Sequence, residues 1–218
     1  MDITFIQKIA IWVIPLLFAI TLHEVAHGWV ASFFGDQTAR FEGRLSLNPV
    51  KHIDLIGTVI VPIIMIMYSN FIFGWAKPVP VDPRNFRHPH RDMAFVALAG
   101  PLTNIAMAFF WGGIAKAGIF STLKGNSWFG EPLLYMGSAG IMINVVLAVL
   151  NFIPLPPLDG GKILAGLLPR GAANQLTLLE PYGFFILIIL MFSGVLSYVM
   201  GPFISFFINL IEAIFRLG

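Results

Sequence analysis

The sequence predicts an all-α polytopic membrane protein with about four to six membrane-embedded helices, a re-entrant segment and a short membrane-associated β-hairpin. Of its 218 residues, 57% are hydrophobic and only 11% are charged. Its mean hydropathy is +0.84. Several apolar runs also reach the length of about 20 residues that a bilayer-spanning helix needs. This composition is typical of a membrane protein and not of a soluble core.

Apolar runs define the expected helices. The stretches that are apolar enough to enter a bilayer are residues 9–34, 53–73, 93–118, 134–154 and 182–215. The last is too long for one span, and Gly201–Pro202 predicts a break within it. Beyond that break the pattern favours an amphipathic helix at the interface, with a second span as the alternative. No loop is long enough for a further domain, so we expect residues 1–218 to form a single membrane domain.

The most informative motif is HEVAH, residues 23–27, inside the first apolar run. Ionisable side chains in a membrane are costly and call for a functional explanation. On a helix, His23 and His27 stand at i and i+4 and point from one face. Such a pair can hold zinc, with Glu24 beside it as a base for water. The competing interpretation is a polar patch satisfied by neighbouring helices.

A catalytic zinc site needs a third protein ligand. The best candidate is Asp159 in the segment NFIPLPPLDGG, residues 151–161, where prolines and glycines follow an apolar helix. Irregular backbone at membrane depth is tolerated where it lines a cavity or is buried in protein. We therefore expect one Zn²⁺ per chain, held by His23, His27 and Asp159.

The remaining polar residues give weaker signals. Asn104 and Asn144 lie in apolar spans, where hydrogen bonding between helices is the simplest role. Asn151 is close enough to Asp159 in the sequence to reach the site. The loop histidines are expected to be solvated; they are His52, His88 and His90.

Composition also excludes several classes. The chain has no cysteine, so disulfides and thiolate zinc ligands are ruled out. The formal net charge of +2 is too small to suggest a nucleic-acid partner. The composition makes the lipid bilayer the expected partner, and the sequence does not specify an oligomeric state.

Three segments together resemble the site-2 protease family of intramembrane zinc metalloproteases, peptidase family M50. They are HEVAH (23–27), AGPLTN (99–104) and NFIPLPPLDGG (151–161). The resemblance implies that His23, His27 and Asp159 hold zinc, that Glu24 is the catalytic base, and that Asn151 assists near the scissile bond. It also implies that FGWAKPVPV is a membrane-associated hairpin that receives substrate. Many family members carry a PDZ or CBS domain, for which this chain has no room.

Topology follows from the need for the zinc ligands to meet at one depth. If the first four apolar stretches all cross, Asp159 ends on the membrane face opposite to the loop after His27, whereas a re-entrant 53–73 removes the conflict. The alternative is that 53–73 crosses and the extended stretch 74–92 threads back. The re-entrant arrangement also gathers most basic residues on one face, which the positive-inside rule places in the cytosol. These residues are Arg40, Arg44, Lys51, Lys77, Arg84, Arg87, Arg91, Lys162 and Arg170. We therefore expect a multi-pass cell-membrane protein with its active site towards the cytosol.

The resulting functional hypothesis is a zinc-dependent endopeptidase that cuts within or near transmembrane segments of membrane-anchored proteins. Residues 74–81 are expected to offer an edge strand that pairs with an unwound substrate through the N–H groups of Lys77 and Val79. The alternatives are a metal-ion transporter and a noncatalytic zinc-binding membrane scaffold. A transporter needs ligands along a path to both faces, and a scaffold has no need of Glu24.

Overall fold

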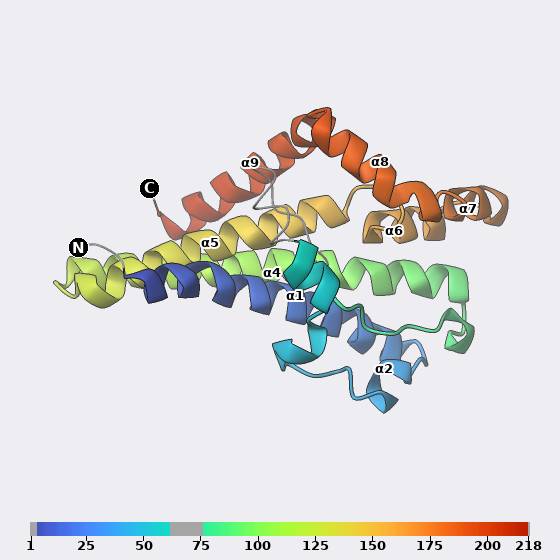
Figure 1. Cartoon of the computed structure of the whole chain (residues 1–218), viewed down its shortest axis with the longest axis horizontal. Coiled ribbons are helices and arrows are strands. Elements are labelled where there is room, and N and C mark those ends of the chain that lie inside the picture. Colours follow the sequence, from blue (N-terminus) through green and yellow to red (C-terminus); the bar gives the residue numbers. More distant parts are fainter. Residues whose placement is uncertain (1–3, 62–75, 218) are drawn as a thin grey trace.

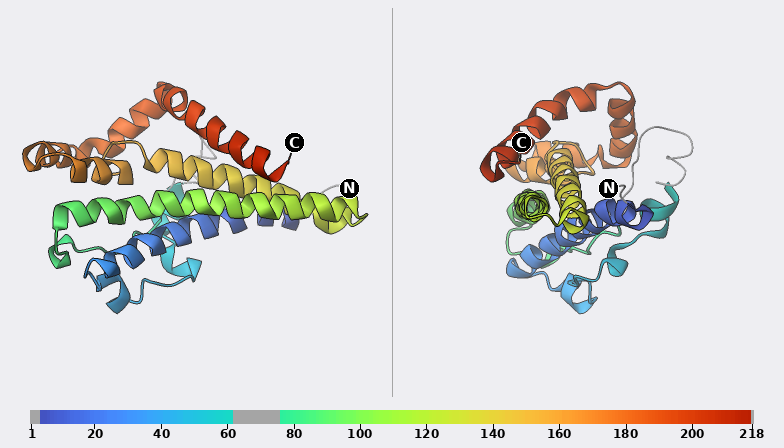
Figure 2. Two further views of the ribbon diagram at one scale, coloured as in Figure 1. Left: turned by 180° about the vertical axis from the view of Figure 1, so that it is seen from behind. Right: turned by 90° about the vertical axis from the view of Figure 1, so that its left-hand side faces the viewer.

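The computed structural model describes residues 4–61 and 76–217 (Figure 1). Three long helices form its centre: α1 (Phe5–Phe33), α4 (Pro89–Leu123) and α5 (Ser127–Asn151). They lie side by side, and α4 runs antiparallel to both neighbours (Figures 1 and 2). The three helices correspond to three of the predicted apolar stretches.

Local sequence explains where α1 begins and ends. Thr4 and Gln7 form a capping box, in which each side chain binds the backbone N–H of the other residue. The helix then continues through Pro15 to Phe33. Gly35 follows with a φ of +109°, a conformation that favours glycine and turns the chain out of the helix.

Short helices connect α1 to α4 on one side of the bundle. They are α2 (Thr38–Phe41), η1 (Pro49–His52), the π-helical η2 (Leu55–Ile60) and η3 (Pro83–Asn85). The described part of this connection contains no β-strand, so the hairpin predicted at FGWAKPVPV is not observed in its described residues, 76–81. The segment 34–52 forms α2 and η1, and residues 62–75 lie outside the description.

Two residues that flank the predicted re-entrant segment 53–73 lie next to each other. The backbone N–H of Lys77 donates to the carbonyl of His52 at 2.9 Å. Asp36 also accepts hydrogen bonds from the N–H of Asp82 (2.8 Å) and from Asn85 (2.9 Å). Residues on both sides of the predicted re-entrant segment therefore lie beside Asp36, just after the C-terminal end of α1. The re-entrant path itself stays a prediction. Residues 62–73 of the predicted re-entrant segment lie outside the described part of the chain.

The C-terminal third folds over one face of the bundle. It contains α6 (Asp159–Leu167), α7 (Arg170–Thr177), α8 (Glu180–Phe192) and α9 (Val195–Phe215). In Figures 1 and 2, α8 and α9 form an inverted V above α5.

The predicted break at Gly201–Pro202 is wrong. The chain turns at Gly194, with a φ of +76°, and α9 then runs unbroken past Pro202. Tolerance of proline in an apolar helix explains why, because local adjustments and neighbouring groups satisfy the freed carbonyl. Within α9, Met200 and Ile211 enter the core between α4 and α5, together with Trp111, Val145 and their neighbours. The apolar stretch 182–215 is therefore two helices that meet at Gly194.

Four described helices are long and apolar enough to cross a membrane: Ile6–Phe33, α4, α5 and α9. The pair α7 and α8, bent by 65°, gives a fifth candidate if it counts as one span. These helices fit a multi-pass membrane protein.

Candidate metal centre

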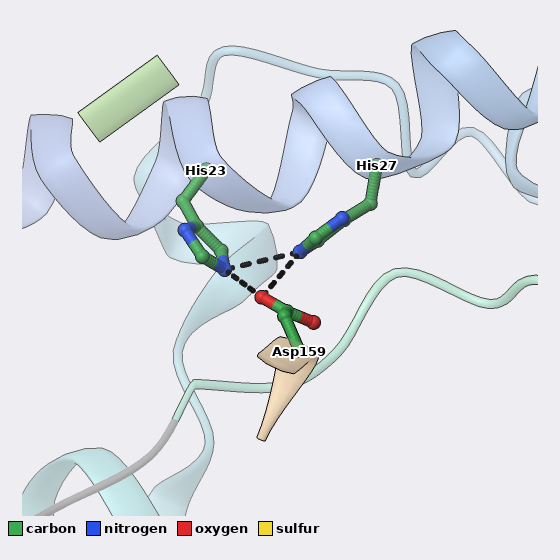
Figure 3. Close-up of side chains that lie close together, drawn as sticks. All are labelled: His23, His27 and Asp159. Atoms are coloured by element: carbon green, nitrogen blue, oxygen red, sulfur yellow. Dashed lines mark hydrogen bonds and ion pairs between the residues drawn. The ribbon is translucent and has the colours of Figure 1, made fainter. Parts of the chain in front are cut away.

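Side chains from α1 and α6 converge at a single point (Figure 3). His23 and His27 project from the same face of α1, and their Nε2 atoms are 3.0 Å apart. Asp159 Oδ2 lies 3.1 Å from the Nε2 of His23 and 3.2 Å from that of His27. All three predicted zinc ligands thus meet, across more than 130 residues of sequence. Among the described residues they are the one group of His, Cys, Asp and Glu side chains close enough to hold a metal ion.

The loop before α6 places Asp159 at the first position of that helix. A carboxylate is favoured there because the helix N-terminus carries partial positive charge. Two glycines allow the close packing that this turn needs: a Cβ on Gly160 would stand 2.2 Å from the carbonyl oxygen of Ile153, and one on Gly161 would stand 2.5 Å from the nitrogen of Pro156. In the sequence LDGG, the two glycines that follow Asp159 therefore allow the tight turn that sets the position of its carboxylate.

Hydrogen bonds fix the orientation of both imidazoles. The Nδ1 of His27 lies 2.8 Å from the carbonyl oxygen of Val96, so it must carry the proton. The Nδ1 of His23 lies 2.6 Å from Asn104 Oδ1, whose amide nitrogen donates to Ala19 O and to Asn144 Oδ1. Asn104 Oδ1 is thus an acceptor, and His23 also donates through Nδ1. Both Nε2 lone pairs then point to the centre, the arrangement typical of metal-ligating histidines.

The donor set fits a zinc ion. Two imidazole lone pairs face Asp159 Oδ2, a buried oxygen without a hydrogen-bond partner in the described chain. Three acceptor atoms held together without a proton are mutually repulsive, and a cation removes the repulsion. Ligand atoms about 2.0–2.1 Å from a tetrahedral zinc stand about 3.3 Å apart, close to the observed separations. The other carboxylate oxygen, Oδ1, lies 3.8 Å from Lys162 Nζ.

A glycine on α4 makes room for this centre. A Cβ on Gly100 would stand 2.5 Å from His23 Cε1 and 2.5 Å from His27 Nε2. Gly100 and Asn104 are one turn apart and lie on the same face of α4. One face of this helix thus gives space to the imidazoles and also orients one of them.

Glu24 lies beside the ligands in a cavity of about 680 Å³. Its Oε2 accepts a hydrogen bond of 2.7 Å from the backbone N–H of Val79. Asn151 lines the same cavity, with its amide nitrogen bonded to the carbonyl of Leu147 at 2.9 Å. Leu187 of α8 also lines this cavity. A substrate in this cavity would lie against both the ligands and the carboxylate of Glu24.

Several sequence predictions need revision at this site. The N–H groups of Lys77 and Val79, predicted to be available for substrate, donate to His52 O and to Glu24. His52, predicted to be solvated, is buried. Its Nε2 is hydrogen-bonded to Ser46 O, and its carbonyl oxygen accepts a hydrogen bond from the N–H of Lys77. Asn104 does link helices, as predicted.

The contact of Asn104 with His23 was not predicted from the sequence. The signal that could have found it is a polar side chain in an apolar span of a protein that also has intramembrane histidines.

Comparisons with known proteins agree with this geometry. Residues 112–193 match the model of peptidase family M50, a region that includes Asp159. YwhC of Bacillus subtilis, whose name describes it as a zinc metalloprotease, is 38% identical over 88% of this chain and 85% of its own length. Rip2 of Mycolicibacterium smegmatis, also named a zinc metalloprotease, is 28% identical over 88% of this chain and 69% of its own length. No solved structure matches the chain.

The HEVAH helix lies outside the matched part of the family model, but the similarity to YwhC extends over most of the chain. This identity and coverage establish that the chain belongs to peptidase family M50. It is therefore a membrane-embedded metalloprotease.

Proposed function

We propose that the chain binds one zinc ion through His23, His27 and Asp159 and hydrolyses peptide bonds within or near transmembrane segments of membrane-anchored proteins. The observation that carries this proposal is the convergence of two oriented imidazoles and a buried carboxylate in a cavity that also contains Glu24. Zinc at such a site supplies Lewis acidity, which polarises a carbonyl and makes water nucleophilic at neutral pH.

Two side chains of the cavity would take part in the reaction, Glu24 by proton transfer and Asn151 by hydrogen bonding. Glu24 lies next to His23 in the sequence and lines the same cavity, so it can take a proton from the attacking water and pass it to the leaving amine. Asn151 lines the cavity on the opposite helix, α5, where an amide can hydrogen-bond the peptide near the scissile bond. A metal-ion transporter has no need of either role.

The decisive test is Glu24→Gln in the purified full-length protein. We expect zinc content to stay at one per chain, because Glu24 is not a ligand. Cleavage of membrane-anchored substrates should fall at least about 100-fold with the loss of the general base. Proteomics of membrane-anchored fragments that accumulate in cells with this variant would identify substrates. Unchanged cleavage would reject the proposed mechanism.

We further propose that the metal centre faces the cytosol. Most basic residues belong to the α1–α4 connection, the start of α4, α6 and α7, and these elements lie at the same end of the bundle as the C-terminal end of α1 (Figure 1). Lys8 and Lys124 lie towards the other end, as does Arg216, whose carbonyl accepts a hydrogen bond from Lys116 at 3.1 Å. This asymmetry is the one that the positive-inside rule associates with a cytosolic face.

Cysteine labelling tests this orientation in a chain that has no native cysteine. We expect Arg40→Cys and Arg84→Cys, both at exposed positions, to react only when the cytosolic face is accessible. Lys124→Cys should react only from outside. Labelling of Arg40→Cys and Arg84→Cys from opposite faces would contradict both the cytosolic orientation and the re-entrant path predicted for 53–73.

A further inference from the structure

A short segment lies against the HEVAH helix next to the metal centre. Residues 76–81 are called the strap here, and they cross the face of α1 that carries Glu24 and Gly28, which are one helical turn apart. A Cβ on Gly28 would stand 2.8 Å from Val79 Cγ1 and 2.6 Å from Leu45 Cδ2. The absence of a side chain at Gly28 therefore allows the strap to approach α1.

Three sets of hydrogen bonds hold the strap in place. Lys77 donates its N–H to His52 O at 2.9 Å. Arg44 donates from Nη2 to the carbonyls of Lys77 (3.0 Å) and Pro78 (3.2 Å). The third contact is the one from Val79 N–H to Glu24 Oε2. Two of the three join the strap to the loop before it, and the third joins it to the carboxylate in the cavity.

Sequence makes the third contact specific. Residues 78 and 80 are prolines and have no N–H, so Val79 supplies the single backbone donor in the run 78–80. The Val79 side chain is buried, with 6% of its surface exposed, which fixes where its N–H points. The Pro-Val-Pro sequence thus presents one backbone donor to one carboxylate oxygen.

We propose that the Val79 N–H is a positioning group for the general base, holding Glu24 by one oxygen so that the other can accept the proton of the attacking water. This inference rests on the proposed function and assigns the strap a role in the chemical step. A carboxylate on a flexible side chain samples several rotamers, and a hydrogen bond to one oxygen restricts that sampling. Positioning of this kind raises the rate of the bound complex without adding to substrate affinity.

The competing role is substrate capture, in which the same N–H pairs with an unwound substrate. The two roles differ in the kinetic constant they affect. Loss of a substrate contact raises KM, whereas loss of base positioning lowers kcat with KM unchanged. A third possibility, a latch that blocks the base until substrate arrives, predicts that kcat rises when the bond is removed.

The sharpest experiment replaces the Val79 amide with an ester, which exchanges the N–H for an oxygen and keeps the side chain. The full-length protein is made by translation with the α-hydroxy analogue of valine and placed in nanodiscs. The probe is a labelled single-span model protein whose transmembrane segment contains Gly, Pro and Asn. Loss of one hydrogen bond to a charged group predicts a kcat lower by about 10- to 100-fold. KM should change by less than about 2-fold, and zinc content should not change.

The matched control is the same exchange at Gly171, whose N–H lies in the first turn of α7, where the helix provides no acceptor. This control should keep wild-type kcat and KM. An independent variant, Gly28→Ala, displaces the strap through Val79 and should show the same fall in kcat. Its control is Gly201→Ala, where an added Cβ meets nothing within 4 Å.

Each other outcome overturns the assignment. A raised KM with unchanged kcat would assign the N–H to substrate, a raised kcat would make the strap a latch, and unchanged constants would leave the contact without a kinetic role. Failure of the proposed function itself would give a different result. If Glu24 were not the general base, Glu24→Gln would still cleave the probe, whatever the Val79 ester does.

Discussion

The two ends of the α1–α4–α5 bundle are built from different interactions. At the metal end, helices meet through polar groups: Asn104 contacts His23, Ala19 O and Asn144, which in turn donates to Gly140 O. At the far end, α4 and α5 meet through glycines. A Cβ on Gly137 would stand 2.4 Å from the backbone nitrogen of Ala115. Polar contacts thus appear where they orient the ligands, and close backbone packing holds the rest.

This difference follows from the cost of polar groups in a membrane. A buried amide or imidazole in hydrocarbon needs a partner, so these groups are tolerated where each can satisfy another. Glycines allow helices to approach without such groups, because dispersion contacts between backbones replace them. A glycine has a different role at each end: Gly100 leaves space for the imidazoles, and Gly137 leaves space for another helix.

The largest effect is expected from Gly100→Ala. The added methyl would lie 2.5 Å from both imidazoles and would push them out of ligating geometry. Zinc should be lost almost completely while the purified protein stays helical, as metal analysis and circular dichroism would measure. Full zinc occupancy in this variant would show that the ring positions differ from those described.

Gly137→Ala should have the opposite pattern. Here the methyl meets the backbone of α4, which cannot move aside as a side chain can. We expect a loss of about 3 kcal/mol in the free energy of unfolding, the upper range for overpacking, with zinc still bound below the unfolding temperature. Thermal unfolding in detergent, followed alongside metal content, would check it. Zinc loss without destabilisation would argue against the division between the two ends.

Asn104→Ala should weaken zinc affinity by about 10- to 100-fold, the usual cost of removing a partner that orients a ligand. The change removes the acceptor for His23 Nδ1 but leaves all three ligands in place. Competition with a chelator measures the affinity. Ser138→Ala, on the neighbouring helix but bonded only within it, is the control that should bind zinc normally. Equal affinities in the two variants would contradict the orienting role.

The smallest effect concerns Asp36, which joins the two loops at the metal end. Burial alone would raise the pKa of this carboxyl, but hydrogen bonds from Thr38, Asn85 and the Asp82 N–H outweigh it and lower the pKa. A lowered folded-state pKa stabilises the fold above the unfolded value and loses that contribution as pH falls through it. Asp36→Asn should therefore cost about 1 kcal/mol at pH 7, and the difference should shrink below about pH 4. A difference that does not vary with pH would contradict this.

The sequence predicted the chemistry more fully than the architecture. HEVAH and LDGG identified all three converging side chains, because ligand spacing on a helix and a carboxylate in a Gly-Pro turn are local patterns. Hydropathy located the spans for the same reason. The turn between α8 and α9 at Gly194 was missed because proline is the stronger local signal, and an apolar environment tolerates Pro202 within α9.

Long-range contacts account for the other differences. No local pattern shows that Val79 N–H meets Glu24 or that Gly100 faces two imidazoles, since these residues are 55 and more than 70 positions apart. The hairpin prediction failed in the described residues for the same reason. The N–H groups that were expected to pair as a strand have partners elsewhere in the fold.

The central claim is that two imidazoles from α1 and one carboxylate from α6 hold a single zinc ion. Zinc K-edge X-ray absorption of the purified protein tests it most directly, with Asp159→Ala and His88→Ala beside the wild type. We expect two imidazole nitrogens and oxygen donors at about 2.0–2.2 Å, an unchanged spectrum in His88→Ala, and loss of bound zinc in Asp159→Ala. A wild-type shell with other than two imidazoles, or an unchanged spectrum in Asp159→Ala, would contradict the claim.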